Sequence, residues 1–181
     1  HYPASRIVPT EFEPHFRKQL LHGTVHDEGA AMLGGVSGHA GLFGNSNDVA
    51  KLMQLYLNDG MYANKRYIAE NVVKEYSKCQ FCEQGNYRAL GFDRPAKPGA
   101  PNSNAAPSAP VESFGHSGFT GTYTWIDPVN NLVYVFLSNR VNPTRENNKL
   151  SKLNTRTGVL QVVYDAMGKS KENQPTEASA K

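Results

Sequence analysis

The sequence lacks several features that would assign it to a class of protein at once. Its 181 residues include only two cysteines and one tryptophan, and the formal net charge is only +3. No apolar run approaches the roughly 20 residues that a membrane-spanning helix needs. Lysine and arginine are too scattered to form a nucleic-acid-binding patch. We therefore expect no membrane-spanning segment and no nucleic-acid partner, but a folded domain with a sizeable core.

The two cysteines, Cys79 and Cys82, stand in a Cys-Gln-Phe-Cys stretch. This spacing occurs in thioredoxin-like redox pairs and in zinc sites. Redox motifs of that kind follow a strand at the start of a helix, and a zinc site needs two more ligands at short spacing, neither of which this stretch offers. We expect a local disulfide or two structural thiols.

The most informative stretch of the chain is residues 112–139. A polar Gly-His-Ser-Gly turn at residues 115–118 leads into alternating β-branched and aromatic residues up to Trp125. Asp-Pro and Asn-Asn then mark a chain reversal before the apolar run Leu132–Leu137. The pattern predicts a turn followed by two antiparallel strands, the second buried on both faces. It does not fit a nucleophile elbow, because residue 119 is not glycine and strand, not helix, follows the serine.

The remaining periodicity predicts helices separated by loops. One is expected to start at Thr10 or Glu13 and to end at Gly23, and others to begin with Asp27 as the N-cap and to cover 47–58, 69–76 and 155–167. Residues 93–112 carry five prolines, and we expect them to form a long loop on the rim of a binding cleft rather than a linker between domains. Residues 169–181 lack large apolar side chains and are predicted to be a disordered tail after Gly168.

Four histidines lie close together near the N-terminus, beside Asp27 and Glu28. His22 and His26 are four residues apart, which is metal-ligand spacing, and a metallohydrolase using these two with His39 is one alternative. Glycine and β-branched residues between His22 and His26 argue against a continuous helix there. We expect hydrogen-bonded structural or pocket-lining histidines, no metal site and no cofactor.

A resemblance to a known superfamily rests on the order of several motifs. Residues 116–118, His-Ser-Gly, with Phe-Thr-Gly at 119–121 and the hairpin after them, resemble the third conserved motif of the β-lactamase and penicillin-binding-protein superfamily of serine hydrolases. That motif is usually Lys-Thr-Gly, with a histidine first in several members. The stretches 25–28 and 34–43 are similar to the segment that follows the catalytic tyrosine in class C-like members. The resemblance implies that residues 1–168 are the C-terminal half of such a domain, with an α+β fold in which helices flank an antiparallel sheet.

The same resemblance implies a catalytic role for each residue of the motif. His116 would take the position of the usual lysine beside the nucleophile, although an imidazole is a weaker fixed charge than an ammonium group. Ser117 would offer its hydroxyl to the substrate, and Gly118 would let the substrate backbone approach closely. The backbone N–H of Phe119 would be the second donor of the oxyanion hole.

Two further positions follow as substrate contacts, Thr120 and Asn139 at the end of the second strand. The implied substrate is a small molecule or a peptide of the peptidoglycan, β-lactam or ester type. Such domains are usually exported to the periplasm or cell envelope.

One essential element is missing. No Ser-x-x-Lys, the nucleophile motif of the superfamily, occurs anywhere in the sequence. The chain begins with His1, and we expect it to belong to a longer protein whose preceding half supplies the serine. By itself it should be inactive, and its sheet should lack strands. The alternative from another class is a non-catalytic module that binds cell wall or protein.

Overall fold

The computed structural model describes residues 2–97 and 104–172. Its elements form three small antiparallel sheets, in the orders β1-β2, β3-β4 and β5-β6-β7, together with five α-helices and two short 3-10 helices. The bounds are β1 Glu11–Glu13, β2 Gln19–Leu21, α1 Glu28–Met32, α2 Ser46–Leu57, β3 Met61–Tyr62, β4 Lys65–Arg66, α3 Glu70–Ser77, β5 Phe114–Ser117, β6 Tyr123–Asp127, β7 Leu132–Phe136, α4 Lys149–Lys152 and α5 Thr155–Glu172, with 3-10 helices at Ala4–Arg6 and Cys82–Gln84.

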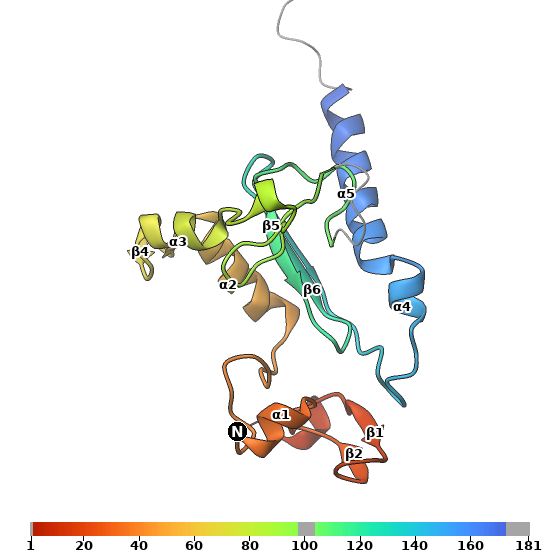
Figure 1. The fold of residues 1–181 in the computed structure, drawn as a ribbon. Helices are drawn as coiled ribbons and strands as arrows, with labels where there is room; N and C mark the ends of the chain where they lie inside the picture. Colours follow the sequence, from red (N-terminus) through yellow and green to blue (C-terminus); the bar gives the residue numbers. More distant parts are fainter. Residues whose placement is uncertain (1, 98–103, 173–181) are drawn as a thin grey trace, which may run out of the picture.

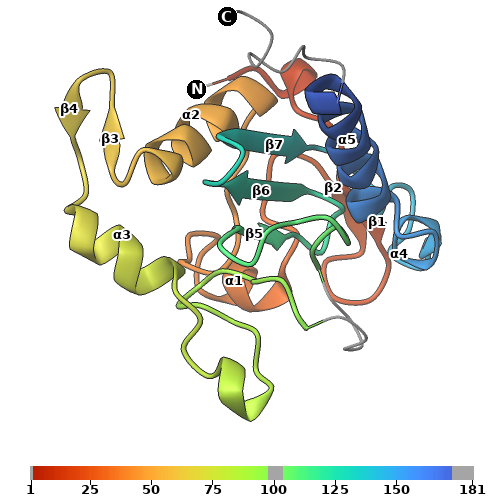
Figure 2. The ribbon, with the colours of Figure 1, turned by 90° about the horizontal axis from the view of Figure 1, so that it is seen from above.

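The three-stranded sheet β5-β6-β7 lies at the centre, with α2 against one face and α5 against the other (Figures 1 and 2). This arrangement confirms the predicted α+β class with helices flanking an antiparallel sheet. Ser117 pairs with Tyr123, and Tyr123 pairs with Phe136. The end of β5, the start of β6 and the end of β7 therefore lie side by side at one end of the sheet. The turn 118–122 and the segment that follows β7 lie at this same end of the sheet.

Alternation along β6 and β7 sends side chains to two separate cores, because successive residues of a strand face opposite sides. On the α5 face, Tyr123 and Trp125 pack with Leu160 and Tyr164, and the OH of Tyr164 donates to the buried carboxylate of Asp127 at 2.9 Å. On the α2 face, Met53 packs with two strand residues, Phe114 and Ile126.

The predicted hairpin is present as β6 and β7, but two details differ. Residues 114–117 form a strand, β5, instead of a turn, because Asp93 and β6 offer hydrogen bonds on both sides of Gly115. The second strand of the hairpin, β7, is half-buried along its whole length rather than buried. The physical reason is that β7 pairs with β6 alone among the described residues, so its other edge is open.

The helix predicted between Thr10 and Gly23 is wrong; the chain forms the hairpin β1-β2 there. The carboxylate of Glu13 accepts backbone N–H bonds from residues 15, 16 and 17, which folds a tight loop in place of a helical turn. Lys18 then takes a positive φ of 52° and leads into β2. Glu11 and Glu13 point inward while Phe12 is exposed, the reverse of the usual pattern.

The other predicted helices are present. Asp27 caps α1 by accepting from Ala30 N, and Asn45 caps α2 by accepting from Asp48 N. Helix α3 covers the region predicted around residues 69–76. Helix α5 continues to Glu172, so its end was predicted too early at Met167, and residues 169–172 are helical rather than tail. Residues 173–181 of the predicted tail lie outside the described residues.

The proline-rich segment packs onto the sheet at both of its described ends, and residues 98–103 lie outside the described part. Asp93 exchanges two backbone hydrogen bonds with Gly115, at 2.7 and 3.1 Å. Ala105 and Ala106 belong to the core under α5. Its place on a cleft rim stays a prediction.

Cys79 and Cys82 form a disulfide, the local bridge that was one of the two expected outcomes. Within residues 2–97 and 104–172, none of the helices combines the length and apolar character needed to cross a bilayer.

Candidate active site

The motif residues His116 and Ser117 lie at the end of β5, where the backbone is tightly fixed. A Cβ on Gly115 would lie 2.1 Å from the carbonyl oxygen of Thr124 and 2.4 Å from the ring of Trp125, so only glycine fits between β5 and β6. The backbone at this point is therefore pressed against β6. The next residue, His116, is exposed, and Ser117 is half-buried with no hydrogen bond to its hydroxyl among the described residues.

The turn after β5 contains a peptide group with one end fixed and the other end free. The carbonyl oxygen of Gly118 accepts from Gly121 N at 3.1 Å and from Arg156 Nη1 at 3.1 Å. In a trans peptide the C=O and the following N–H point in opposite directions. The N–H of Phe119 therefore points away from these two donors, and it has no hydrogen-bond partner in residues 2–97 and 104–172. A free, pre-oriented N–H is what an oxyanion hole requires.

The carbonyl groups that follow are also held. Arg140 Nε donates to the carbonyl of Phe119 at 2.8 Å, and Arg140 N donates to the carbonyl of Thr120 at 2.8 Å. A Cβ on Gly118 would lie 2.2 Å from Thr122 Oγ1, so a side chain at that position would require the Thr122 hydroxyl to move. Since the carbonyls of residues 118–120 all accept hydrogen bonds, the turn is rigid.

The ring of Phe119 contacts one aromatic side chain, His26, and one cationic side chain, Arg140, and the residue is 60% exposed. It stacks on the imidazole of His26, with centroids 5.6 Å apart, and the guanidinium carbon of Arg140 lies 4.6 Å from its centroid. His26 in turn hydrogen-bonds to Glu11 at 2.6 Å. The turn is thereby connected to the N-terminal hairpin.

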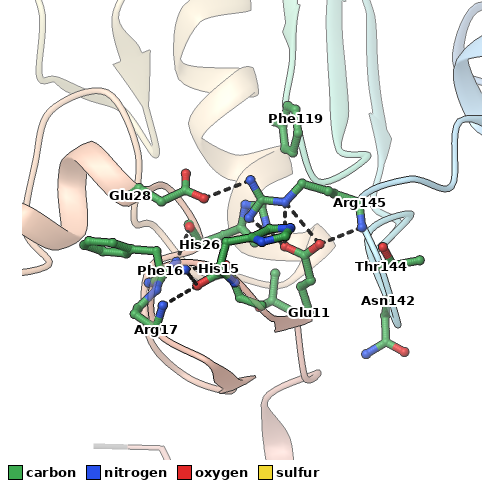
Figure 3. Close-up of polar contacts among 12 residues, drawn as sticks. Glu11, His15, Phe16, Arg17, His26, Glu28, Phe119, Asn142, Thr144 and Arg145 are labelled. Atoms are coloured by element: carbon green, nitrogen blue, oxygen red, sulfur yellow. Dashed lines mark hydrogen bonds and ion pairs between the residues drawn. The ribbon is translucent and has the colours of Figure 1, made fainter.

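A partly buried cluster of charges fastens that hairpin to the loop after β7 (Figure 3). Arg145 contacts both oxygens of Glu11, at 3.0 and 3.1 Å from Nε, and its Nη1 forms an ion pair with Glu28 at 2.8 Å. Burial by itself raises the pKa of Glu11, but the hydrogen bonds from Arg145 and His26 outweigh it and leave the pKa below its usual value. The hydrogen bond to Glu11, opposed by a smaller effect of burial and reinforced by Glu28, raises the pKa of Arg145.

Asn139 lies at the same end of the sheet as the turn 118–122. Its Nδ2 donates to the carbonyls of Pro9 at 2.7 Å and Thr10 at 3.1 Å, and its buried Oδ1 has no hydrogen-bond partner in the described parts of the chain. The amide therefore holds the N-terminal segment against the sheet. Its predicted substrate contact, like that of Thr120, stays a prediction.

The histidines of the metal alternative have separate partners. His22 bonds to the carbonyl of Ile7, His26 to Glu11, and His39 to Ser37 and Asp27. Within residues 2–97 and 104–172, no three histidine, cysteine or acidic side chains come together as a metal site would require. These three histidines are hydrogen-bonded, as expected; whether they are structural or line a pocket stays a prediction.

Sequence reasoning found the motif but missed the arginines around it. Arg88 lies beside His116, and Arg140 and Arg156 hold the turn, yet each comes from a different segment of the chain. No local sequence pattern marks these arginines. They come near the motif only because the fold brings the loop 78–94, the segment after β7 and the start of α5 to one end of the sheet.

Comparison with known proteins identifies the family of the chain. The family model described as Beta-lactamase matches residues 5–157. The chain belongs to the beta-lactamase family. A protein named "Putative D-alanyl-D-alanine carboxypeptidase" from Salmonella agona (strain SL483) is 38% identical over 145 residues, which cover 76% of this chain and 32% of that protein. The protein of the same name from Salmonella gallinarum (strain 287/91 / NCTC 13346) is 38% identical over 143 residues with the same coverage.

Among solved structures, a match is "Crystal structure of putative beta-lactamase from Bacteroides dorei DSM 17855", with a TM-score of 0.40 and 15% identity over 75% of this chain and 45% of that one. The 181-residue chain spans about a third of the length of the curated Salmonella relatives that it matches.

Proposed function

We propose that this chain forms one wall of the active site of a serine hydrolase that acts through an acyl-enzyme. The observation that carries the proposal is the Gly118–Phe119 peptide, whose carbonyl is held by Arg156 while its N–H is free beside His116 and Ser117. Membership of the beta-lactamase family and the name of the Salmonella relatives support a peptide ending in D-alanyl-D-alanine, or a β-lactam, as the substrate.

In this proposal the chain contributes electrostatic stabilisation and substrate positioning. The N–H of Phe119 donates to the oxyanion of the tetrahedral intermediate, a contribution worth roughly 10²–10³ in rate when such a donor is removed. Ser117 offers its hydroxyl to the substrate, and Gly118 leaves space for it. The nucleophilic serine and its lysine come from the half of the domain that precedes this chain, because no Ser-x-x-Lys occurs in residues 1–181.

The Cys79–Cys82 disulfide supports an oxidising location, which agrees with export to the periplasm or cell envelope. The preceding half of the domain is then an intramolecular partner, and the chain by itself has no acyl-enzyme activity.

The test compares two proteins with two probes, a fluorescent penicillin and a fluorescent fluorophosphonate. We expect both probes to label the full-length protein and neither to label residues 1–181 alone. If neither protein is labelled, a non-catalytic binding module explains the site better. If the chain alone is labelled, Ser117 or Ser37 is a nucleophile and the proposed division of the site is wrong.

A further inference from the structure

The ring of Phe119 provides a third point of attachment for the turn that carries the free N–H. The carbonyl of Gly118 accepts from Arg156, and the carbonyl of Phe119 accepts from Arg140. At a carbonyl oxygen the direction of a hydrogen bond has a broad distribution, so these two bonds alone leave the peptide planes able to tilt. The ring stacks on His26 with 24° between the two planes. This contact restrains the Cα–Cβ bond of Phe119 and thereby limits the tilt of its N–H.

The imidazole of His26 is itself held in one orientation. Its side chain is only 9% exposed, and Nε2 lies 2.6 Å from Oε2 of Glu11 (Figure 3). The carboxylate of Glu11, whose pKa is below its usual value, is ionised at neutral pH and can only accept. Nε2 therefore carries a proton and donates it. The imidazole cannot turn without breaking this hydrogen bond in a place shielded from water.

The charges behind His26 give it direction more than they give the fold stability. Strand β1 buries Glu11 and Glu13 and exposes Phe12, and Arg145 pairs with Glu11. Buried ion pairs contribute little net stability, because the loss of hydration offsets the attraction between the charges. What this arrangement does provide is a chain of fixed orientations, from Arg145 to Glu11 and from Glu11 to His26. In the described parts of the chain, the one aromatic contact of His26 is with Phe119.

We propose that His26 is a positioning residue for the reaction: its ring, oriented by Glu11, keeps the N–H of Phe119 directed at the oxyanion. His26 acts through Phe119, and it neither touches the substrate nor transfers a proton. This inference rests on the proposed function for its effect on turnover, but the direction of the N–H can be measured on the chain without any reaction.

The kinetic test uses the full-length protein and two variants that separate the ring of His26 from its hydrogen bond. His26→Gln keeps an N–H donor for Glu11 but has no ring, whereas His26→Phe keeps the ring but cannot donate to Glu11. We expect His26→Gln to slow acylation by both penicillin and fluorophosphonate about fivefold, and His26→Phe to slow it less than twofold. An aromatic contact at this spacing is worth roughly a two- to tenfold change in rate when it is lost.

Stability should follow the opposite order, and urea unfolding of residues 1–181 would measure it. His26→Phe should be the less stable variant, because the buried Glu11 loses a hydrogen bond that His26→Gln retains. If the labelling rates fall in the same order as stability, His26 acts only by supporting the fold and the proposal is wrong.

The matched control is His22→Gln, which changes a second histidine beside the same hairpin. His22 bonds to the carbonyl of Ile7 and makes no ring contact with the turn among the described residues. This variant should leave both labelling rates within twofold. A loss equal to that of His26→Gln would show that any disturbance of the hairpin slows the reaction, which would overturn the proposal.

A double-mutant cycle keeps the test decisive if His26→Phe does not fold. Phe119→Leu removes the ring but leaves the backbone N–H, so on this background His26→Gln should cause no further loss of rate. Losses that multiply would mean that His26 does not act through Phe119.

The direction of the Phe119 N–H can be followed by its NMR residual dipolar coupling in residues 1–181. The coupling should change in His26→Gln and should stay the same in His22→Gln; an unchanged coupling in His26→Gln would overturn the positioning role. If the full-length protein is labelled by neither probe but the coupling changes as expected, the proposed hydrolase activity fails and the control of this N–H by His26 stands.

Discussion

Nη1 of Arg156, at the start of α5, lies 3.1 Å from the carbonyl oxygen of Gly118, at the end of the motif. Since the N–H of the same peptide belongs to Phe119, a residue on a helix controls the direction of a backbone donor at the opposite end of that peptide group. A positive charge at the carbonyl also polarises the peptide, so the N–H becomes a stronger donor.

Replacing Arg156 should therefore reduce acylation without changing any group that touches the substrate. For Arg156→Gln in the full-length protein we expect about tenfold slower acylation by both penicillin and fluorophosphonate, because the Phe119 N–H is less well oriented. This is smaller than the roughly 10²–10³ lost when an oxyanion donor is removed outright. Stopped-flow or gel-based labelling rates would measure it.

The matched control is Lys152→Gln on α4, which removes an exposed positive charge that forms no hydrogen bond or ion pair with the turn among the described residues. It should leave both rates within twofold. A backbone amide shift of Phe119 that is the same in Arg156→Gln and in the unaltered chain would show that the guanidinium does not position this peptide.

Gly115 and Gly158 should respond in opposite ways to the same change. In Gly115→Ala the new methyl group would meet Thr124 O and the ring of Trp125, so we expect a loss of about 1–3 kcal/mol in the free energy of unfolding. In Gly158→Ala the methyl group meets open space within α5, and alanine is the better helix former, so a gain of about 0.5–1 kcal/mol is expected.

Urea unfolding of each variant checks this pair of predictions. Trp125 is the single tryptophan and is fully buried, so its fluorescence reports on the sheet directly. If Gly115→Ala unfolds at the same urea concentration as the unaltered chain, the close approach of β5 to β6 is not a constraint on the fold.

The elements that could be predicted from the sequence are those specified by local chemistry. The hairpin β6-β7 follows from β-branched and aromatic residues on either side of the Asp127–Asn131 reversal, and α2 from its cap at Asn45 and its apolar face. The motif His116–Phe119 was likewise found because its residues are consecutive. In each case the decisive residues lie within a few positions of one another.

The N-terminal hairpin could not be predicted, because long-range charges override its hydrophobic pattern. Glu11 can be buried because it pairs with Arg145, 134 residues later in the sequence. Since neighbouring residues of a strand face opposite sides, Phe12 is then exposed. For the same reason the arginines beside the motif could not be predicted from the sequence. Arg88 and Arg156 reach the motif from segments 28 and 38 residues away from the residues that they contact, and neither stands in a pattern of its own.

Reducing the Cys79–Cys82 disulfide should have a modest effect on stability, because the bridge closes a loop of only four residues. Loop-closure entropy for such a ring corresponds to about 2 kcal/mol. We expect dithiothreitol to lower the free energy of unfolding by no more than this amount. The double variant Cys79→Ser with Cys82→Ser should match the reduced chain and should no longer respond to dithiothreitol; a larger loss would mean that the bridge also supports the contacts of Arg88.

Acid should release the N-terminal hairpin before it affects the central sheet. Hydrogen bonds from Arg17 N, opposed by a smaller effect of burial and reinforced by Phe16 N and His15 N, lower the pKa of Glu13 to about 2. The pKa of Glu11 is lowered as well. A carboxylate whose pKa is lower in the folded state stabilises the fold fully above its unfolded value near 4.5, and this contribution disappears as the pH falls through the folded value.

The free energy of unfolding should therefore decline between about pH 4.5 and pH 2, as urea titrations at several pH values would show. Glu13→Gln should be less stable than the unaltered chain at pH 7, because an uncharged amide accepts the hydrogen bonds of the loop more weakly than a carboxylate does. Its stability should also depend less on pH across this window, because the amide does not titrate. Glu83→Gln, which removes an exposed carboxylate outside this cluster, should leave both the value and the slope unchanged. If Glu13→Gln keeps the full slope, carboxylates elsewhere cause the acid sensitivity, and Glu13 does not hold the β1-β2 loop.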